Sequence, residues 1–336
     1  MSVKDALALA VAGAPLPEAA MEAAMTDMLT GAADPLRVAA LLTALHMRGE
    51  TAEEIASGAG AMRAQARMIA APPGTLDTCG TGGTGLHTLN VSTATAIVLA
   101  SLGVPVAKHG NRAASSLSGS TDVLGALGVR TDLTPERAER VLASTGLAFL
   151  FAPTHHPAVA NVAAVRRALG FRTVFNLLGP LSNPAGARRQ LLGVYDGALC
   201  RPLAEALRAI GSERAWVVHG ADGVDELTVC GPSRACVLAD GEVEEREVTP
   251  EEAGLTRHPE GSLRGGDPAH NAGAMRALFG GATGPYRDAV ALNAAAGLVI
   301  AERADGLADG ARQAEAALDD GRAKAILDRI TAETNA

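Results

Sequence analysis

The sequence predicts an α/β fold, in which a small N-terminal helical domain precedes a larger α/β domain with a largely parallel central sheet. Three observations lead to this prediction. Apolar residues follow helical spacing over the first seventy positions, the stretch "APPG" at 71–74 breaks that pattern, and short apolar runs then alternate with helix-like segments. Such alternation is typical of a parallel sheet with helical crossovers. We therefore place the domains at 1–70 and 75–336.

Helix signals recur through the N-terminal domain. Asp34 followed by Pro35 is typical of a helix start, because proline tolerates the first helical position. Gly49 is placed to end this helix, and Thr51 with Glu54 predicts a capping box for the next one. The apolar residues between start and end have helical spacing: Val38, Leu41, Leu42 and Leu45.

The second domain is predicted from the apolar runs "VPVA", "LAFLFA", "LLGVY" and "AWVVHG", which we expect to be strands. Residues 234–250 predict a β-hairpin with Asp240 and Gly241 at its turn. The stretches 285–304 and 309–335 are predicted to be helical. Helices from about 156 to 185 are expected to pack on the N-terminal domain.

Composition narrows the class of protein. The 336 residues carry a net charge of -8, so we expect no nucleic-acid partner. Four scattered cysteines without a CxxC pair indicate a reduced, cytoplasmic protein that lacks a structural zinc site. Neither a signal peptide nor an apolar run of about 18 residues is present, so we expect no membrane association.

The stretch "DTCGTGGTGLHTLNVSTATA" at 77–96 joins four glycines to a predicted helix start. Open main-chain N–H groups at a helix N-terminus attract anions, which favours phosphate binding. A flexible turn before a capped helix would need only one glycine. The stretch matches neither GxGxxG nor the Walker P-loop, so it supports neither a dinucleotide site nor a P-loop NTPase.

A second loop of the same character begins after "VPVA" with "KHGNRAASSLSGS". Lys108 and Arg112 supply positive charge, Gly110 permits close approach, and several serines supply hydroxyl donors. Both loops follow predicted strands, so both are expected at the carboxyl edge of the sheet, where α/β proteins bind ligands. A solvated polar loop would explain one such segment more easily than two.

The segment "HGADGVDELTV" places Asp222, Asp225 and Glu226 after a predicted strand. Mg²⁺ prefers oxygen ligands and is commonly held by one or two carboxylates together with substrate phosphates. A solvated acidic turn is the plain alternative, but two phosphate loops in the same domain favour the metal site.

A fourth segment, residues 151–185, contains His155 and His156 and then Arg166 and Arg167 on a predicted helix. A guanidinium can hold a carboxylate through two parallel hydrogen bonds. Adjacent arginines on a helix are usually solvated, at least one of them. The histidines lack the i, i+4 spacing of a helical metal site, so we do not predict zinc.

These four segments, in this order, resemble the anthranilate phosphoribosyltransferase family of tryptophan biosynthesis over nearly the whole chain. The most specific parts are "GTGG" with "NVST", "KHGNRAASS", "VRRALG" with "NLLGPLSNPA", and "DGVDE". The resemblance implies a fold of the nucleoside phosphorylase and phosphoribosyltransferase type, substrates that meet at a hinge, and a homodimer formed through the helical domain.

It also implies a Mg²⁺-dependent reaction, the second step of tryptophan synthesis from chorismate. The 5-phosphoribosyl group of 5-phospho-α-D-ribose 1-diphosphate (phosphoribosyl pyrophosphate) would pass to the amino group of anthranilate, with release of diphosphate. Two Mg²⁺ ions are expected, although the sequence itself gives no count.

The resemblance assigns site residues by matching positions. Phosphoribosyl pyrophosphate would contact Gly80, Gly83, Thr84, Thr88, Asn90, Val91, Ser92, Thr93, Lys108, His109, Gly110, Asn111, Arg112, Ala113, Ala114, Ser115, Ser116 and Ser120. Ser92, Asp225 and Glu226 would bind Mg²⁺. Gly80, Asn111 and Arg166 would face anthranilate, with Asn111 and Arg166 positioning it and Arg166 pairing with its carboxylate. No residue is identified as a general base.

One departure from the family pattern bears on function. The family usually reads GTGGDG in the glycine loop, whereas this chain reads "GTGGTG", so that Thr84 stands in place of an aspartate. This substitution removes a negative charge and a strong acceptor beside the expected pyrophosphate. It puts substrate affinity and metal dependence in question.

Two other functions remain open at this point. A pyrimidine nucleoside phosphorylase has a related fold but would need a site for a base instead of a carboxylate. A non-catalytic relative that binds nucleic acid is disfavoured by the acidic balance and by the Asp225–Glu226 pair.

Overall fold

The computed structural model describes residues 2–112 and 117–336, and the centre of this described chain is a sheet of seven strands. The strand order is β3-β2-β1-β4-β5-β6-β7. Neighbours from β3 to β5 run parallel, whereas β6 and β7 add an antiparallel edge. The strands are β1 Leu76–Gly80, β2 Val106–Gly110, β3 Leu147–Phe151, β4 Arg189–Gly193, β5 Arg214–Gly220, β6 Ser233–Ala239 and β7 Glu242–Val248. The predicted α/β fold with a largely parallel sheet is confirmed.

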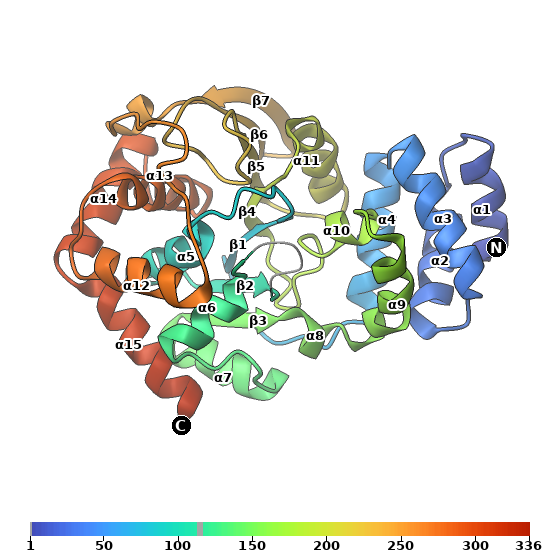
Figure 1. The fold of residues 1–336 in the computed structure, drawn as a ribbon, viewed down its shortest axis with the longest axis horizontal. Coiled ribbons are helices and arrows are strands. Elements are labelled where there is room, and N and C mark those ends of the chain that lie inside the picture. Colours follow the sequence, from blue (N-terminus) through green and yellow to red (C-terminus); the bar gives the residue numbers. More distant parts are fainter. Residues whose placement is uncertain (1, 113–116) are drawn as a thin grey trace.

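Helices form a separate body beside the sheet and also cover the sheet itself (Figure 1). The helical body contains α1 Val3–Val11, α2 Glu18–Thr30, α3 Pro35–Arg48, α4 Ala52–Ala64, α9 Ala160–Leu169 and α10 Val174–Leu178, and the short α8 Ala152–His155 leads into it from β3. The α/β body contains α5 Val91–Ser101, α6 Ser120–Leu127, α7 Pro135–Thr145, α11 Cys200–Ala209, α12 Pro268–Phe279, α13 Pro285–Ile300, α14 Leu307–Asp319 and α15 Arg322–Asn335. Within residues 2–112 and 117–336, no helix is both long enough and apolar enough to cross a membrane.

The local signals in the N-terminal region form as predicted. The Asp34 side chain accepts hydrogen bonds from the N–H groups of the first turn of α3, and Pro35 occupies the first helical position. Thr51 and Glu54 form a capping box at the start of α4. Side chains at both helix starts therefore satisfy main-chain donors that the helix itself leaves open.

The predicted hairpin is β6 and β7, and its turn consists of Asp240 and Gly241. Both residues have positive φ, 52° and 82°. A two-residue hairpin turn of this kind matches the right-handed twist of the strands, and glycine and aspartate tolerate the conformation better than most residues.

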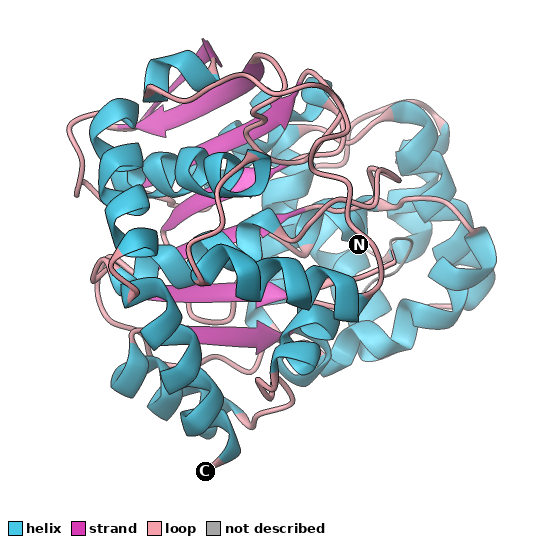
Figure 2. Ribbon diagram, turned by 60° about the vertical axis from the view of Figure 1, so that its left-hand side comes forward, coloured by secondary structure: helices cyan, strands magenta, loops and turns pink. Residues whose placement is uncertain are grey.

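The sheet is buried on both faces, which explains why its strands read as continuous apolar runs. Along β5, Trp216 and Val218 pack into a core shared with α5 and α13, whereas Ala215 and Val217 pack into a core shared with α11 and the helical body. Figure 2 shows helices in front of and behind the strands. The polar ends of the strands are consequently the part of the sheet open to a ligand.

Candidate active site

The glycine loop runs from the end of β1 at Gly80 to α5, whose N-cap is Asn90. Gly82, Gly83 and Gly85 have φ angles of 61°, 80° and 74°, which side chains rarely adopt. The glycines are therefore required by the shape of the main chain. The N–H of Thr81 donates to the Gly193 carbonyl on β4 at 2.9 Å, so the loop begins at the junction of β1 and β4.

The acidic turn after β5 lies directly against this loop. One oxygen of Asp225 accepts a hydrogen bond from the Gly82 N–H at 2.9 Å, and one oxygen of Glu226 accepts from the Ser92 N–H at 3.1 Å. Glu226 is thus linked to Ser92 at the start of α5, and Asp225 to the glycine loop that leads into α5, although the acidic turn is far from both in the sequence. The fit is close, because a Cβ added at Gly80 would lie 2.6 Å from Asp225 Oδ2.

The two carboxylates are held where a cation is needed. Burial, followed by the neighbouring charge of Asp225, raises the pKa of Glu226 to about 8. Burial also raises the pKa of Asp225. The two adjacent carboxylates are half-buried and repel each other, so a divalent ion would stabilise their charged forms. Two carboxylates and a hydroxyl are hard oxygen donors, and this set fits Mg²⁺ with further ligands supplied by phosphates and water.

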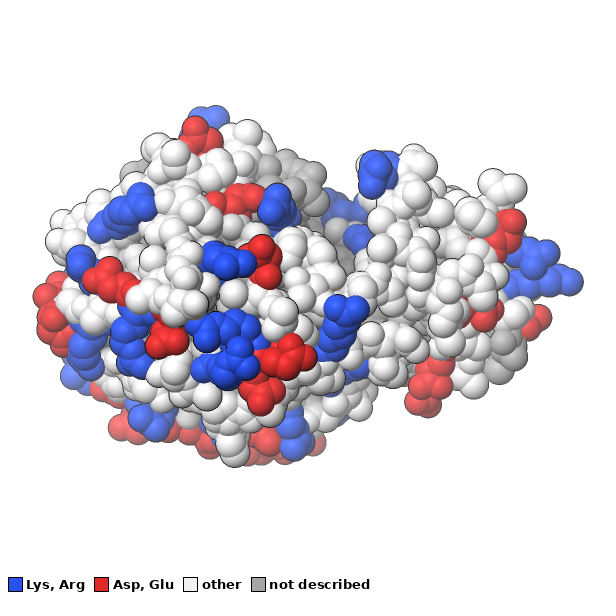
Figure 3. All heavy atoms as spheres, turned by 90° about the horizontal axis from the view of Figure 1, so that it is seen from below, with Lys and Arg blue, Asp and Glu red and all other residues white. Residues whose placement is uncertain are grey.

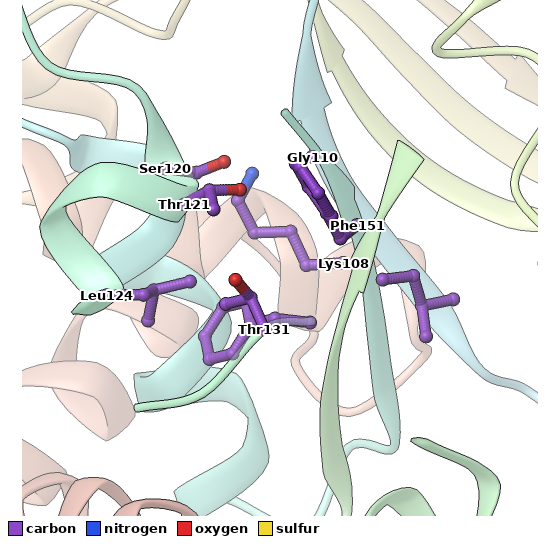
Figure 4. Close-up of a pocket in the computed structure, with 9 residues that line it drawn as sticks. Lys108, Gly110, Ser120, Thr121, Leu124, Thr131 and Phe151 are labelled. Carbon is purple, nitrogen blue, oxygen red and sulfur yellow. The ribbon is translucent and has the colours of Figure 1, made fainter. Parts of the chain in front are cut away.

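The second predicted loop begins at the end of β2. Lys108 is buried, and its ammonium donates to the Thr78 carbonyl on β1. Figure 4 shows the ammonium pointing toward Ser120 and Thr121 on α6, beside a cavity of about 10 Å³ that Phe151 also lines. Among the described residues, no carboxylate forms an ion pair with Lys108. A buried cation in this situation is a suitable partner for an anionic ligand.

The residues after β2 turn back toward α6. Ser120 Oγ donates to the Asn111 carbonyl at 3.2 Å, and a Cβ at Gly110 would lie 2.5 Å from the same hydroxyl oxygen. Arg112 lies with its guanidinium 5.9 Å from the centre of the Phe151 ring. The structure therefore brings Lys108, Gly110, Asn111 and Ser120 together. Four predicted site residues lie outside the described part of the chain: Ala113, Ala114, Ser115 and Ser116.

A pair of buried histidines lies between the end of β2, which carries His109, and the helical body. The rings of His109 and His156 are 5.1 Å apart between centroids, and Nδ1 of His109 is 3.1 Å from the Gly179 carbonyl. Burial, and then the neighbouring His156, lowers the pKa of His109 to about 3; burial likewise lowers the pKa of His156 to about 4. Both rings are consequently neutral at physiological pH.

Arg166 lies on α9 of the helical body, with its guanidinium 5.2 Å from the centre of the Phe175 ring. Burial lowers the pKa of Arg166, whereas its neighbour Arg167 is exposed. Within residues 2–112 and 117–336, no hydrogen bond or ion pair joins Arg166 to either loop. Its guanidinium could therefore accept an anion as a hydrogen-bond partner.

Several residues in contact with the loops were missed by the sequence analysis. Arg172 donates to the Gly83 carbonyl at 3.2 Å and lies over the Tyr195 ring. Asn271 on α12 donates to the side chain of Asn90 at 2.9 Å. No motif marked Asn271. Arg172, by contrast, lies within the fourth segment and could have been noticed as a third arginine there.

Comparisons with known proteins agree with this geometry. Residues 4–66 match the model of the glycosyl transferase family helical bundle domain, and residues 72–324 match that of the glycosyl transferase family a/b domain. The chain is 52% identical over 313 residues to the anthranilate phosphoribosyltransferase of Azorhizobium caulinodans, covering 93% of this chain and 91% of the relative. It is 51% identical over 329 residues to that of Rubrobacter xylanophilus, covering 98% and 96%.

Solved structures give the same result. A crystal structure of anthranilate phosphoribosyltransferase from Thermus thermophilus superimposes with a TM-score of 0.94 at 46% identity, over 99% of this chain and all of that one. The chain belongs to the anthranilate phosphoribosyltransferase family. The Saccharomyces cerevisiae enzyme, solved in complex with phosphoribosyl pyrophosphate and Mg, superimposes with a TM-score of 0.87 at 26% identity, over 95% of this chain and 94% of that one.

Membership of the anthranilate phosphoribosyltransferase family confirms the resemblance found in the motifs and makes the chain a glycosyltransferase. Neither alternative, the nucleoside phosphorylase or the nucleic-acid-binding relative, is favoured by these comparisons. On the face that Figure 3 shows, basic and acidic side chains alternate, and its described residues form no extended basic area.

Proposed function

We propose that this chain transfers the 5-phosphoribosyl group of phosphoribosyl pyrophosphate to the amino nitrogen of anthranilate, and releases diphosphate. The observation that supports this most directly is the contact of the acidic turn with the glycine loop and with the start of α5, through the Asp225–Gly82 and Glu226–Ser92 hydrogen bonds. A pyrophosphate and its metal ion need this combination of main-chain donors and carboxylates.

The donor substrate is proposed to lie between the two loops. Gly80, Gly83, Thr84, Thr88 and the segment from Asn90 to Thr93 would bind it from one side, and the segment from Lys108 to Ser116 with Ser120 from the other. The positive N-terminal end of α5 and the buried Lys108 ammonium supply fixed positive partners. Because these donors are already in place, they stabilise charge that develops on the leaving diphosphate.

Ser92, Asp225 and Glu226 are the residues that would hold Mg²⁺, and we propose two ions in the loaded enzyme. The Saccharomyces cerevisiae relative binds Mg. When bound, the ion neutralises negative charge on the departing diphosphate. The chain's own contribution is to fix the carboxylates, by the Gly82 and Ser92 N–H groups, before substrate arrives.

Anthranilate is proposed to face Gly80, Asn111 and Arg166, with its carboxylate on the Arg166 guanidinium. The nucleophile is a neutral aromatic amine, so it needs positioning more than activation. His109, which lies two residues before Asn111, and His156 are neutral, because burial lowers the pKa of both rings. Neither ring would then compete with Arg166 as the cationic partner of the carboxylate. No residue is required to act as a base before the new bond forms.

We further propose a homodimer formed through the helical body. Three exposed apolar residues of α3 lie on one face of the helix: Leu36, Ala40 and Met47. Ala40 follows Leu36 by 4 residues and Met47 follows it by 11, which correspond to about one and three helical turns. The side chains of Leu36 and Met47 are 81% and 82% exposed, and Val11 of the neighbouring α1 is 72% exposed. A second copy is the occupant we propose for this apolar face. Sedimentation should give twice the mass of the chain, and Met47→Glu should give the monomer.

The cytoplasm is the compartment we propose, on the ground that Cys79, Cys200, Cys230 and Cys236 are all free.

A fluorescence assay tests the proposed reaction. Anthranilate should be consumed when phosphoribosyl pyrophosphate and Mg²⁺ are both present, and consumption should stop when the metal is removed by a chelator. Thymidine with inorganic phosphate should give no turnover, which separates this function from that of a pyrimidine nucleoside phosphorylase. Turnover of thymidine without consumption of anthranilate would overturn the proposal.

A further inference from the structure

Helix α13 presents two polar side chains toward the site, although most of the helix is apolar and buried. Tyr286 and Asn293 are seven residues apart, so they lie on the same face two turns apart, with a rise of about 10 Å between them. Each bonds the main chain within two residues of a proposed Mg²⁺ ligand. Neither residue belongs to the motifs from which the function was inferred.

Asn293 fixes the acidic turn. Its side chain is fully buried; Oδ1 accepts from the Leu227 N–H at 3.1 Å, and Nδ2 donates to the Leu227 carbonyl at 2.8 Å. Nδ2 also donates to the Ala289 carbonyl one turn earlier, at 2.9 Å, which orients the amide. Leu227 follows Glu226 directly. Both main-chain polar groups of Leu227 are thus held by one side chain, and rotation of the turn would break both bonds.

Tyr286 holds the other half of the site. Its hydroxyl donates to the Asn90 carbonyl at 3.2 Å, at the N-cap of α5 and two residues before Ser92. Asn271 on α12 supports the same residue, since its Nδ2 donates to Asn90 Oδ1 while its Oδ1 accepts from the Gly266 N–H at 2.8 Å. The start of α5 is consequently held through both main-chain and side-chain atoms.

An apolar residue at 286 or 293 would serve packing equally well, because both positions adjoin apolar core. A buried amide is costly unless its hydrogen bonds are made, so a fully paired asparagine there indicates a positional requirement. These hydrogen bonds go to the two segments that carry Ser92 and Glu226. The two segments also contact each other directly, because the Ser92 N–H donates to a Glu226 carboxylate oxygen at 3.1 Å.

We propose that α13 acts as a rigid spacer, in which Tyr286 and Asn293 are positioning residues that set the separation between Ser92 and Glu226 for the metal-bound diphosphate. This inference rests on the proposed function. Residues that orient metal ligands from behind typically affect metal affinity by about 10- to 100-fold. The metal is therefore the appropriate probe.

The test compares Asn293→Ala and Tyr286→Phe with the wild type. Binding of Mn²⁺ is followed by electron paramagnetic resonance in the presence of phosphoribosyl pyrophosphate, and steady-state constants are measured with Mg²⁺. Asn293→Ala should raise the Mn²⁺ dissociation constant at least tenfold. Tyr286→Phe, which removes one neutral hydrogen bond, should raise the KM for phosphoribosyl pyrophosphate about fivefold. The KM for anthranilate should stay within about twofold in both.

Asn161→Ala is the matched control, because the Asn161 amide also donates to a main-chain carbonyl, that of Leu29, but in the helical body. It should leave Mn²⁺ binding and both KM values unchanged. Thermal unfolding identifies a purely structural effect: variants with a lower Tm but wild-type Mn²⁺ binding and KM values would overturn the inference. Should Asn293→Ala fail to fold, Tyr286→Phe decides alone. Wild-type protein that binds Mn²⁺ but does not consume anthranilate would contradict the proposed function without contradicting the positioning role of Tyr286 and Asn293.

Discussion

A carboxylate oxygen of Asp225 accepts a hydrogen bond from the main-chain N–H of Gly82 at 2.9 Å, across 143 residues of sequence. This bond joins the acidic turn after β5 to the glycine loop after β1. Beside it, the Ser92 N–H donates to Glu226, so two acidic residues meet the loop and the helix start at once. The account of function depends on this junction, because it places metal-binding carboxylates next to main-chain phosphate donors.

Removing the two charges should separate activity from stability. Asp225→Asn with Glu226→Gln should reduce kcat/KM at least 100-fold and abolish the response to Mg²⁺. Because burial raises the pKa of both groups, their charges are unfavourable without a bound cation, and the double variant measured without metal should unfold at the same Tm as the wild type or higher. Near-normal turnover in the fluorescence assay would reject the metal role.

Gly193 on β4 should not tolerate a side chain. A Cβ at this position would lie 1.6 Å from the Asp225 carbonyl oxygen, so the acidic turn would have to move. Gly193→Ala should lower the free energy of urea unfolding by about 3 kcal/mol and should weaken Mg²⁺ activation. Gly125→Ala in α6 is the control, because nothing lies within 4 Å of the added atom and the helix should gain up to about 1 kcal/mol. Equal stability of the two variants would contradict the geometry.

Arg166 and Arg167 form a matched pair on α9. Arg166→Ala should raise the KM for anthranilate at least tenfold and leave the KM for phosphoribosyl pyrophosphate nearly unchanged, because a charge-assisted contact to the carboxylate is lost. Arg167→Ala should change neither constant, since that side chain is exposed. If only the sugar-phosphate KM rises in Arg166→Ala, the placement of anthranilate is wrong.

The histidine pair makes a prediction about pH. Burial lowers the pKa of His109 from 6.5 to about 3, so below pH 6.5 the unfolded chain binds a proton that the folded chain does not. The contribution of the neutral His109 to the free energy of unfolding is therefore fully present above pH 6.5 and is lost as the pH falls from 6.5 toward 3. Relative to His109→Gln, the wild type should lose about 2 kcal/mol of unfolding free energy between pH 7 and pH 5. A difference that does not vary with pH would show that His109 is already protonated in the folded state, or not buried.

Thr84 stands where the resemblance of the motifs predicts an aspartate in the glycine loop. Its hydroxyl accepts from the Leu86 N–H at 3.4 Å, a bond that an aspartate at this position could also accept. Thr84→Asp should tighten binding of phosphoribosyl pyrophosphate in the presence of Mg²⁺, because it restores a strong acceptor to the loop. A calorimetric titration showing weaker binding would mean that the loop is adapted to threonine.

Much of the fold follows from local rules in the sequence. The cap at Asp34, the capping box at Thr51 and the hairpin turn at Asp240 and Gly241 depend on residues next to one another, so each was predictable. The loop glycines were also recognisable as a cluster. The structure shows that glycine is needed there for positive φ angles as well as for close approach of other atoms.

The tertiary partners of the site were not predictable in this way. Gly193 and Asn293 are ordinary members of a strand and a helix in the sequence, and only their approach to Asp225 and Leu227 gives them importance. Arg172 similarly acquires its role from contact with the Gly83 carbonyl. Contacts between segments far apart in the chain produce no periodicity or composition bias in the sequence, so they cannot be predicted from one sequence alone.

A crystal structure of the protein with phosphoribosyl pyrophosphate and Mg²⁺ tests the central claim most directly. The account predicts diphosphate density between the glycine loop and the loop after β2, with metal density at Ser92, Asp225 and Glu226. Donor bound elsewhere, with both loops empty and no metal at the acidic turn, would contradict it.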